Sequence, residues 1–143
     1  MTYSIGNNDA WQAEAIINVP FHDVDLMGIV WHGHYAKYFE IARCVLLDKI
    51  DYNYLQMRES GFAWPVIDLH IRYPNSAKFA QKLLVKVKIV EWEMRLKMKY
   101  EIEDCETTKR LTKGHSVQVA VNMQNQEMCM VSPPILARKL GLN

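Results

Sequence analysis

The sequence has no excess of either charge and no long apolar run. Seventeen Lys and Arg residues face sixteen Asp and Glu residues in the 143-residue chain, which gives a formal net charge of +1. This balance gives no electrostatic basis for binding nucleic acid or an anionic membrane surface. No apolar run approaches the about 20 residues that a membrane-spanning helix needs. The N-terminus also lacks the basic-then-apolar order of a secretory signal.

Cysteine is scarce, and several catalytic motifs are absent. The three cysteines are far apart, odd in number and not at a metal-binding spacing: Cys44, Cys105 and Cys129. Such cysteines are typical of reduced thiols, so we expect a cytoplasmic protein. The glycines lack the spacing of a P-loop or a dinucleotide-binding fingerprint, and no serine lies in a nucleophile elbow.

The composition is that of one globular domain. Hydrophobic residues make up 50% of the chain and charged residues 23%, a balance that argues against disorder. The length is enough to bury a core of its own. We therefore expect a single domain over residues 1–143, with residues 1–12 as a loose lead-in because they show no periodicity.

A long amphipathic helix is expected over about residues 31–50. Apolar residues recur there at helical spacing along one continuous stripe: Tyr35, Tyr38, Phe39, Ala42, Val45 and Leu46. Asn53 and Gln56 have the spacing of a capping box, which predicts a short second helix that stops near Gly61.

The remaining segments alternate between apolar and polar residues, which predicts strands at residues 13–19, 67–73, 83–89, 96–103, 117–121 and 127–131. One charged face and one apolar face indicate antiparallel strands that are solvated on one side. Ser132 followed by Pro133 predicts a capped C-terminal helix that ends near Gly141. The expected architecture is α+β, with an antiparallel sheet of five or six strands wrapped around one long helix.

Titratable residues gather in the stretch 19–40, which holds two aspartates and three of the five histidines: His22, Asp23, Asp25, His32 and His34. An apolar turn with Gly28 lies among them, and the long helix begins at their end. The plain interpretation is a solvated loop, in which Asp25 caps the turn and His32 caps the helix. A His-x-His pair near carboxylates also offers zinc ligand types. Residues i and i+2 of a helix point apart, however, so we expect no metal.

The same stretch resembles the signature of the hotdog-fold acyl-CoA thioesterases of the 4-hydroxybenzoyl-CoA thioesterase type, especially the bacterial short acyl-CoA hydrolases. The resemblance is carried by paired acids, a glycine-containing apolar turn, an aromatic residue before His, a Tyr and a later acid: Asp23, Asp25, Gly28, Ile29, Val30, Trp31, His32, Tyr35, Phe39 and Glu40. The order of elements matches the hotdog fold along nearly the whole chain after residue 12. It implies hydrolysis of an acyl-CoA thioester without a cofactor. It also implies a homo-oligomer, dimer or tetramer, whose site forms between two subunits.

The family's catalytic acid falls on Asp25, and its catalytic or substrate-positioning histidine falls on His32. Asp25 can attack the thioester carbonyl and form a mixed anhydride, or it can accept a proton from the attacking water. The sequence favours neither route. Backbone N–H groups near His32, at the helix N-terminus, suit a developing oxyanion. The expected substrate contacts are in the turn and the start of the helix: Gly28, Ile29, Val30, Trp31 and Tyr35.

Two features depart from the family pattern. His34 stands where relatives usually carry Asn, and residues 77–81 lack the acids that the family often has there. Contacts made by those acids therefore do not transfer to this chain. Other functions on the same fold are hydrolysis of an acyl carrier protein thioester, non-catalytic binding of an acyl thioester and, less favoured, dehydration.

Overall fold

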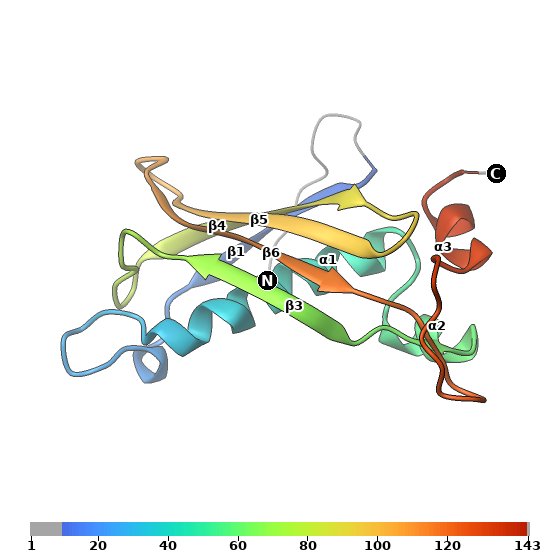
Figure 1. The fold of residues 1–143 in the computed structure, drawn as a ribbon. Helices are drawn as coiled ribbons and strands as arrows, with labels where there is room; N and C mark the ends of the chain where they lie inside the picture. Colours follow the sequence, from blue (N-terminus) through green and yellow to red (C-terminus); the bar gives the residue numbers. More distant parts are fainter. Residues whose placement is uncertain (1–9, 143) are drawn as a thin grey trace.

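A five-stranded antiparallel sheet curves around one long helix in the computed structural model, which describes residues 10–142 (Figure 1). The strands lie in the order β1-β4-β5-β6-β3. Their bounds are β1 Gln12–Asn18, β3 Val66–Arg72, β4 Lys82–Glu91, β5 Leu96–Asp104 and β6 Arg110–Gln118. The α+β architecture expected from the sequence is confirmed.

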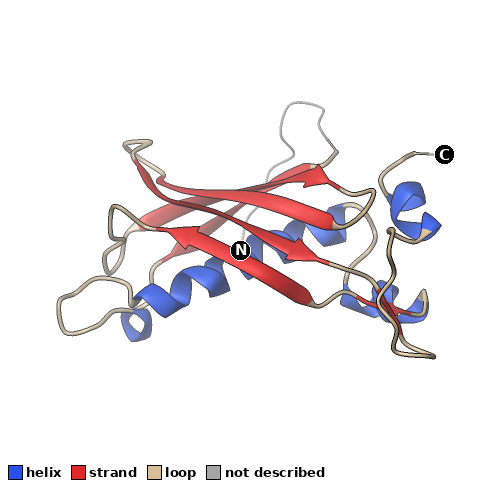
Figure 2. Ribbon diagram, viewed as in Figure 1, coloured by secondary structure: helices blue, strands red, loops and turns tan. Residues whose placement is uncertain are grey.

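The long helix, α1 (Tyr35–Lys49), runs along one face of this sheet (Figure 2). All six residues of the expected apolar stripe are buried. The helix begins later than expected, because residues 32–34 form a separate 3-10 turn in which the His34 amide donates to the Trp31 carbonyl at 2.9 Å. Arg43, which is not one of the stripe residues, is also buried, and its Nη2 donates to the Tyr54 hydroxyl at 3.3 Å.

The core lies between α1 and the inner face of the sheet. The Phe39 ring of α1 stacks on the Tyr100 ring of β5, with ring centroids 4.3 Å apart. On the neighbouring strand, a Cβ at Gly114 would come within 2.7 Å of the Phe39 ring. Glycine at this position therefore lets the helix pack closely against the sheet.

The short second helix, α2 (Tyr54–Glu59), has the capping box that the sequence predicts. The Asn53 side chain accepts from the Gln56 amide at 3.2 Å, and the Gln56 side chain accepts from the Asn53 amide at 2.9 Å. Gly61 follows with φ of +90°, a left-handed conformation that glycine adopts without strain. A two-stranded sheet of β2 (Phe62–Ala63) and β7 (Val121–Asn122) lies beyond it.

Several expectations for the chain ends were wrong. Residues 127–131 are not a strand, since only Met128 forms a bridge, with Val121. The last helix, α3 (Pro134–Lys139), is preceded by Pro133 as its N-cap, and the Ser132 hydroxyl is buried without a partner in the described chain. Strand β6 begins at residue 110, well before 117. The prediction missed residues 110–116 because glycine and charged residues interrupt the alternation there.

The expected lead-in is shorter than residues 1–12. Residues 1–9 lie outside the described residues. Gln12 already belongs to β1, and the indole N–H of Trp11 donates to the Leu140 carbonyl at 3.1 Å. In residues 10–142 no helix is long and apolar enough to cross a membrane.

Candidate functional site

A small hairpin holds Asp25 and His32 at its two ends. Val24 and Val30 pair as an antiparallel bridge, and the Asp25 amide donates to the Ile29 carbonyl at 2.9 Å. Gly28 closes the turn with φ of +76°, which explains why glycine stands there. Asp25 therefore leads into the turn, and His32 follows shortly after the returning arm.

The hairpin is fixed to the segment that follows β3. The Val30 amide donates to the Ala77 carbonyl at 2.8 Å, and Ile29 forms a bridge with Lys78. Val30 is buried and Ile29 half-buried as a result. These two expected substrate contacts are thus part of the packing that holds the turn.

Asp25 has an exposed side chain, and one of its carboxylate oxygens caps the turn. Oδ1 accepts a hydrogen bond of 2.8 Å from the Met27 amide. Within residues 10–142, Oδ2 has no hydrogen-bond or ion-pair partner. The capping role suggested by the plain interpretation is therefore present, yet it leaves one oxygen available and its orientation fixed.

His32 belongs to an aromatic ladder of three rings, His32, Tyr73 and Tyr35. The His32 and Tyr73 rings are nearly parallel, with centroids 6.2 Å apart, and Tyr73 stacks on Tyr35 at 5.3 Å. Tyr73 was missed by sequence reasoning, because it fits the alternation of the strand expected at residues 67–73, whereas β3 ends at Arg72. No hydrogen bond or ion pair joins His32 to Asp25 in the described chain.

Tyr35 anchors the ladder in the core. It is buried, and its hydroxyl accepts a hydrogen bond of 3.1 Å from the Ala77 amide. Burial raises the pKa of the Tyr35 hydroxyl above its ordinary value. The expected contact between Tyr35 and substrate thus competes with a packing role, since the side chain is covered in the single chain.

Trp31 folds over the first residues of the 3-10 turn. A Cβ at Gly33 would overlap the Trp31 ring, so only glycine permits this arrangement. The indole is half-exposed and contacts two imidazoles. Its ring centroid lies 5.0 Å from that of His32, which is tilted to it, and 5.3 Å from that of His34, which is edge-on.

Two amide groups at this turn are unpaired. In the part of the chain that the structure describes, the N–H groups of His32 and Gly33 donate to no other group. The neighbouring amides of Val30, Trp31 and His34 all donate to carbonyl oxygens. Unpaired amides ahead of a helix are suited to a negatively charged oxygen.

Asp23, two residues before Asp25, is instead a buried structural group. Its carboxylate accepts from Lys37 Nζ and from the Tyr38 hydroxyl, each at 2.6 Å, and its carbonyl accepts from the Trp31 amide at 3.0 Å. Burial acts to raise the pKa of Asp23, but the bonds from Lys37 and Tyr38 outweigh it and hold the pKa below its ordinary value. These contacts give Asp23 a structural role.

The histidines of the stretch do not converge on a common point. His22 and His34 approach Asp23 at 3.7 Å and 3.9 Å, whereas His32 stacks on Tyr73. Among the described residues, no three His, Cys, Asp or Glu side chains are grouped so as to hold a metal ion.

Solved structures with this architecture include two CoA thioesterases and a hypothetical protein. A DHNA-CoA thioesterase from Staphylococcus aureus is 27% identical, with a TM-score of 0.76 over 96% of this chain and 83% of that one. A hypothetical protein from Thermus thermophilus is 25% identical, with a TM-score of 0.79 over 91% and 95% of the two chains. A 1,4-dihydroxy-2-naphthoyl-CoA thioesterase from Synechocystis shares the fold, with a TM-score of 0.80 at 19% identity over 90% and 94%.

The sequence matches the family model of the thioesterase-like superfamily over residues 19–138. This range includes the hairpin, the 3-10 turn and α1, together with the four strands β3 to β6 of the main sheet, whereas β1 precedes it. The chain therefore belongs to the thioesterase-like superfamily of thioester hydrolases, and its fold is the hotdog fold.

Proposed function

We propose that this protein hydrolyses an acyl-CoA thioester to the free acid and coenzyme A, with Asp25 as nucleophile or general base. The observation that carries the proposal is the state of the Asp25 carboxylate, in which the Met27 amide holds Oδ1 and Oδ2 has no partner in the described chain. Two amides that have no acceptor in the described chain, those of His32 and Gly33, follow shortly after the returning arm of the same hairpin.

Either use of Asp25 gives a balanced reaction. As nucleophile, Oδ2 bonds to the thioester carbon, the C–S bond breaks, and coenzyme A leaves as a thiolate; water then cleaves the mixed anhydride. As general base, Oδ2 takes a proton from the water that attacks the same carbon. In both cases the amides of His32 and Gly33 can donate to the carbonyl oxygen as it gains charge. The His32 ring can protonate the departing sulfur.

We propose further that a second subunit completes the site. Among the described residues strand β3 pairs only with β6, which leaves its other edge without a partner strand there, and its exposed side chains include Val66, Ile67 and Leu69. Leu26 and Met27, next to Asp25, are also exposed. Such an edge normally finds a partner or is protected by charge. Pairing of two β3 edges would give a dimer.

Light scattering tests this assembly. Wild-type protein should have at least a dimer's mass at micromolar concentration, and Ile67→Lys should lower the mass and the activity together. Leu55→Lys, which changes an equally apolar exposed side chain on α2, is the matched control. A monomeric wild-type protein with full activity would refute the shared site.

Release of free thiol from a panel of short, long and aromatic acyl-CoAs tests the reaction itself. Turnover of at least one of them, unaffected by chelation of metals, supports the proposal. Activity only on acyl groups carried by acyl carrier protein would establish the other hydrolase function on this fold. Binding without turnover of either substrate would instead mark a non-catalytic module.

A further inference from the structure

The outer face of the sheet, turned away from α1, carries a row of basic residues with no acid among them. Lys88 of β4 lies opposite Lys99 of β5, which lies opposite His115 of β6, which lies opposite His70 of β3. Like charges directly opposite each other destabilise a sheet. An occupant of opposite charge would remove this cost.

The row borders a hollow of about 750 Å³ on that face. Six basic side chains line it against two glutamates: Arg72, Lys86, Lys88, Lys99, Arg110 and Lys113. Lys86 pairs with Glu103 at 3.2 Å and Arg110 with Glu101 at 3.4 Å. In residues 10–142 the other four form no ion pair. The hollow therefore concentrates positive charge, although the whole chain has a net charge of only +1.

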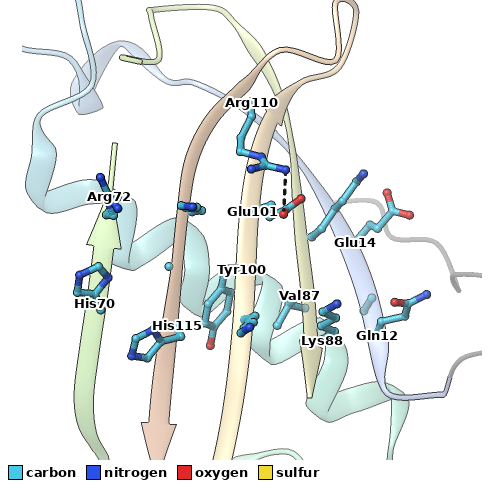
Figure 3. Close-up of a pocket in the computed structure, with 15 residues that line it drawn as sticks. Gln12, Glu14, His70, Arg72, Val87, Lys88, Tyr100, Glu101, Arg110 and His115 are labelled. Carbon is cyan, nitrogen blue, oxygen red and sulfur yellow. Dashed lines mark ion pairs between the residues drawn. The ribbon is translucent and has the colours of Figure 1, made fainter. Parts of the chain in front are cut away.

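The two imidazoles at the β3 end of the row lie face to face. The rings of His70 and His115 are 5.4 Å apart and within 9° of parallel. Figure 3 shows them side by side on neighbouring strands, with Arg72 next along β3. They thus add ring N–H donors to the lysine and arginine side chains.

A second, smaller hollow of about 260 Å³ adjoins the first and shares Arg72, Arg110 and Lys113 with it. Thr112, which is completely buried, also lines the smaller hollow. Thr112 lies opposite Ile102 on β5 and two residues before Gly114, so its side chain faces the core, and the basic side chains of Arg72, Arg110 and Lys113 give the smaller hollow its charge.

We propose that this outer-face hollow binds an oligophosphate. A chain of phosphates places several charges along a line and so matches cations arranged in a row across neighbouring strands. Arginine and lysine are the side chains that recognise phosphate. The volume falls within the range of small-molecule sites. Neither the location nor the chemistry of this hollow depends on Asp25, so binding here does not require that the proposed hydrolysis be correct.

Binding at this face should take up a proton. Around His115 lie His70 and Asp68 on β3, Lys97 and Lys99 on β5, and Lys113 on β6. Partial burial, Lys97, His70 and Lys99 lower the pKa of His115, although Asp68, at 4.0 Å, opposes them. A bound anion favours the protonated ring, so affinity should rise as pH falls from about 7.5 to about 6.

Calorimetric titration with inorganic tripolyphosphate, at about 0.15 M salt to screen diffuse surface charge, tests the proposal. We expect one saturable site per chain, bound more tightly at the lower pH. Lys99→Gln should weaken binding by about tenfold, since it removes one full charge next to the anion. Lys109→Gln removes an exposed lysine away from the hollow and should leave binding unchanged. Absence of saturable binding, or equal losses in the two variants, would overturn the proposal.

Further titrations with ATP and with coenzyme A identify the source of the phosphates. If Lys99→Gln weakens both ligands but leaves the KM for acyl-CoA unchanged, the ligand is a free nucleotide; a raised KM assigns the hollow to the phosphates of the substrate. Asp25→Asn should leave tripolyphosphate binding intact, which separates this site from the hydrolytic one. If a second copy of the chain covered the face instead, tripolyphosphate would not bind and Lys99→Gln would change the mass.

Discussion

The Asp23 carboxylate and the Tyr38 hydroxyl are joined by a buried hydrogen bond of 2.6 Å. Asp23 lies at the base of the hairpin that carries Asp25 and Tyr38 on the first turn of α1, so this bond ties the hairpin to the helix. Lys37, one residue away on the helix, holds the other carboxylate oxygen at the same distance. The position of Asp25 relative to the amides of His32 and Gly33 thus depends on the buried carboxylate of Asp23.

Replacement of Asp23 by Asn should reduce stability more than catalysis. Asn keeps the shape but cannot neutralise Lys37, and removing one partner of a largely buried bonded pair should lower the free energy of unfolding by about 2–3 kcal/mol. Urea titration measures this loss. Lys109→Gln, an exposed change elsewhere, is the control. An Asp23→Asn variant as stable as wild type would show that the anchor is dispensable.

Acid should weaken the fold through the same carboxylate. The pKa of Asp23 is below its ordinary value in the folded chain, so its stabilising effect is complete above the pKa of an unfolded aspartate, about 3.9, and is lost as pH falls through the folded-state pKa. Asp104, whose pKa is about 2 through hydrogen bonds from Gln81 and from the amides of Thr107 and Glu106, acts in the same direction. Denaturant midpoints measured between about pH 5 and pH 2 should fall for wild type. They should fall less steeply for Asp23→Asn, and parallel slopes would contradict this assignment.

Much of the fold could be predicted because its elements bury one face. The stripe on α1 and the alternation of β4 and β5 both arise from a single buried face, which periodicity records directly. Strand β6 was harder, because Gly114 makes room for Phe39 and so leaves a gap in the apolar pattern. Residues 127–131 meet the 120–122 segment in a single bridge, at Met128, and not in a ladder, and local alternation does not tell which segments find an edge long enough to pair with.

The candidate site was only partly predictable for a similar reason. Glycine in the turn and the acid at Asp25 are local features, and the family resemblance placed them. The contact of His32 with Tyr73, and that of Asp23 with Lys37 and Tyr38, join residues that are distant in sequence or lie on different faces of a pattern. Only tertiary packing brings them together, so nothing in the spacing indicates them.

Tyr73 should matter through its ring rather than its hydroxyl. The ring lies between His32 and Tyr35, and stacked aromatic pairs contribute about 0.5–1.5 kcal/mol. Tyr73→Leu should therefore lower kcat for acyl-CoA hydrolysis by about threefold to tenfold, whereas Tyr73→Phe should retain it. Steady-state kinetics on the best substrate of the panel, with thermal melts to confirm folding, decides the matter. Equal kcat values for the Leu variant and wild type would remove Tyr73 from the site.

The central claim is that Asp25 carries the chemistry, and the most direct test is the kcat of Asp25→Asn. Asn keeps the turn because its side-chain oxygen can still accept from the Met27 amide, but it can neither attack nor take a proton. Asp23→Asn, two residues away, is the matched control and should cost far less, and His32→Ala should fall between the two. We expect kcat of Asp25→Asn to fall by at least about a hundredfold while the fold and acyl-CoA binding persist. A variant that keeps more than about a third of wild-type kcat would contradict the account and leave Asp25 as a turn residue alone.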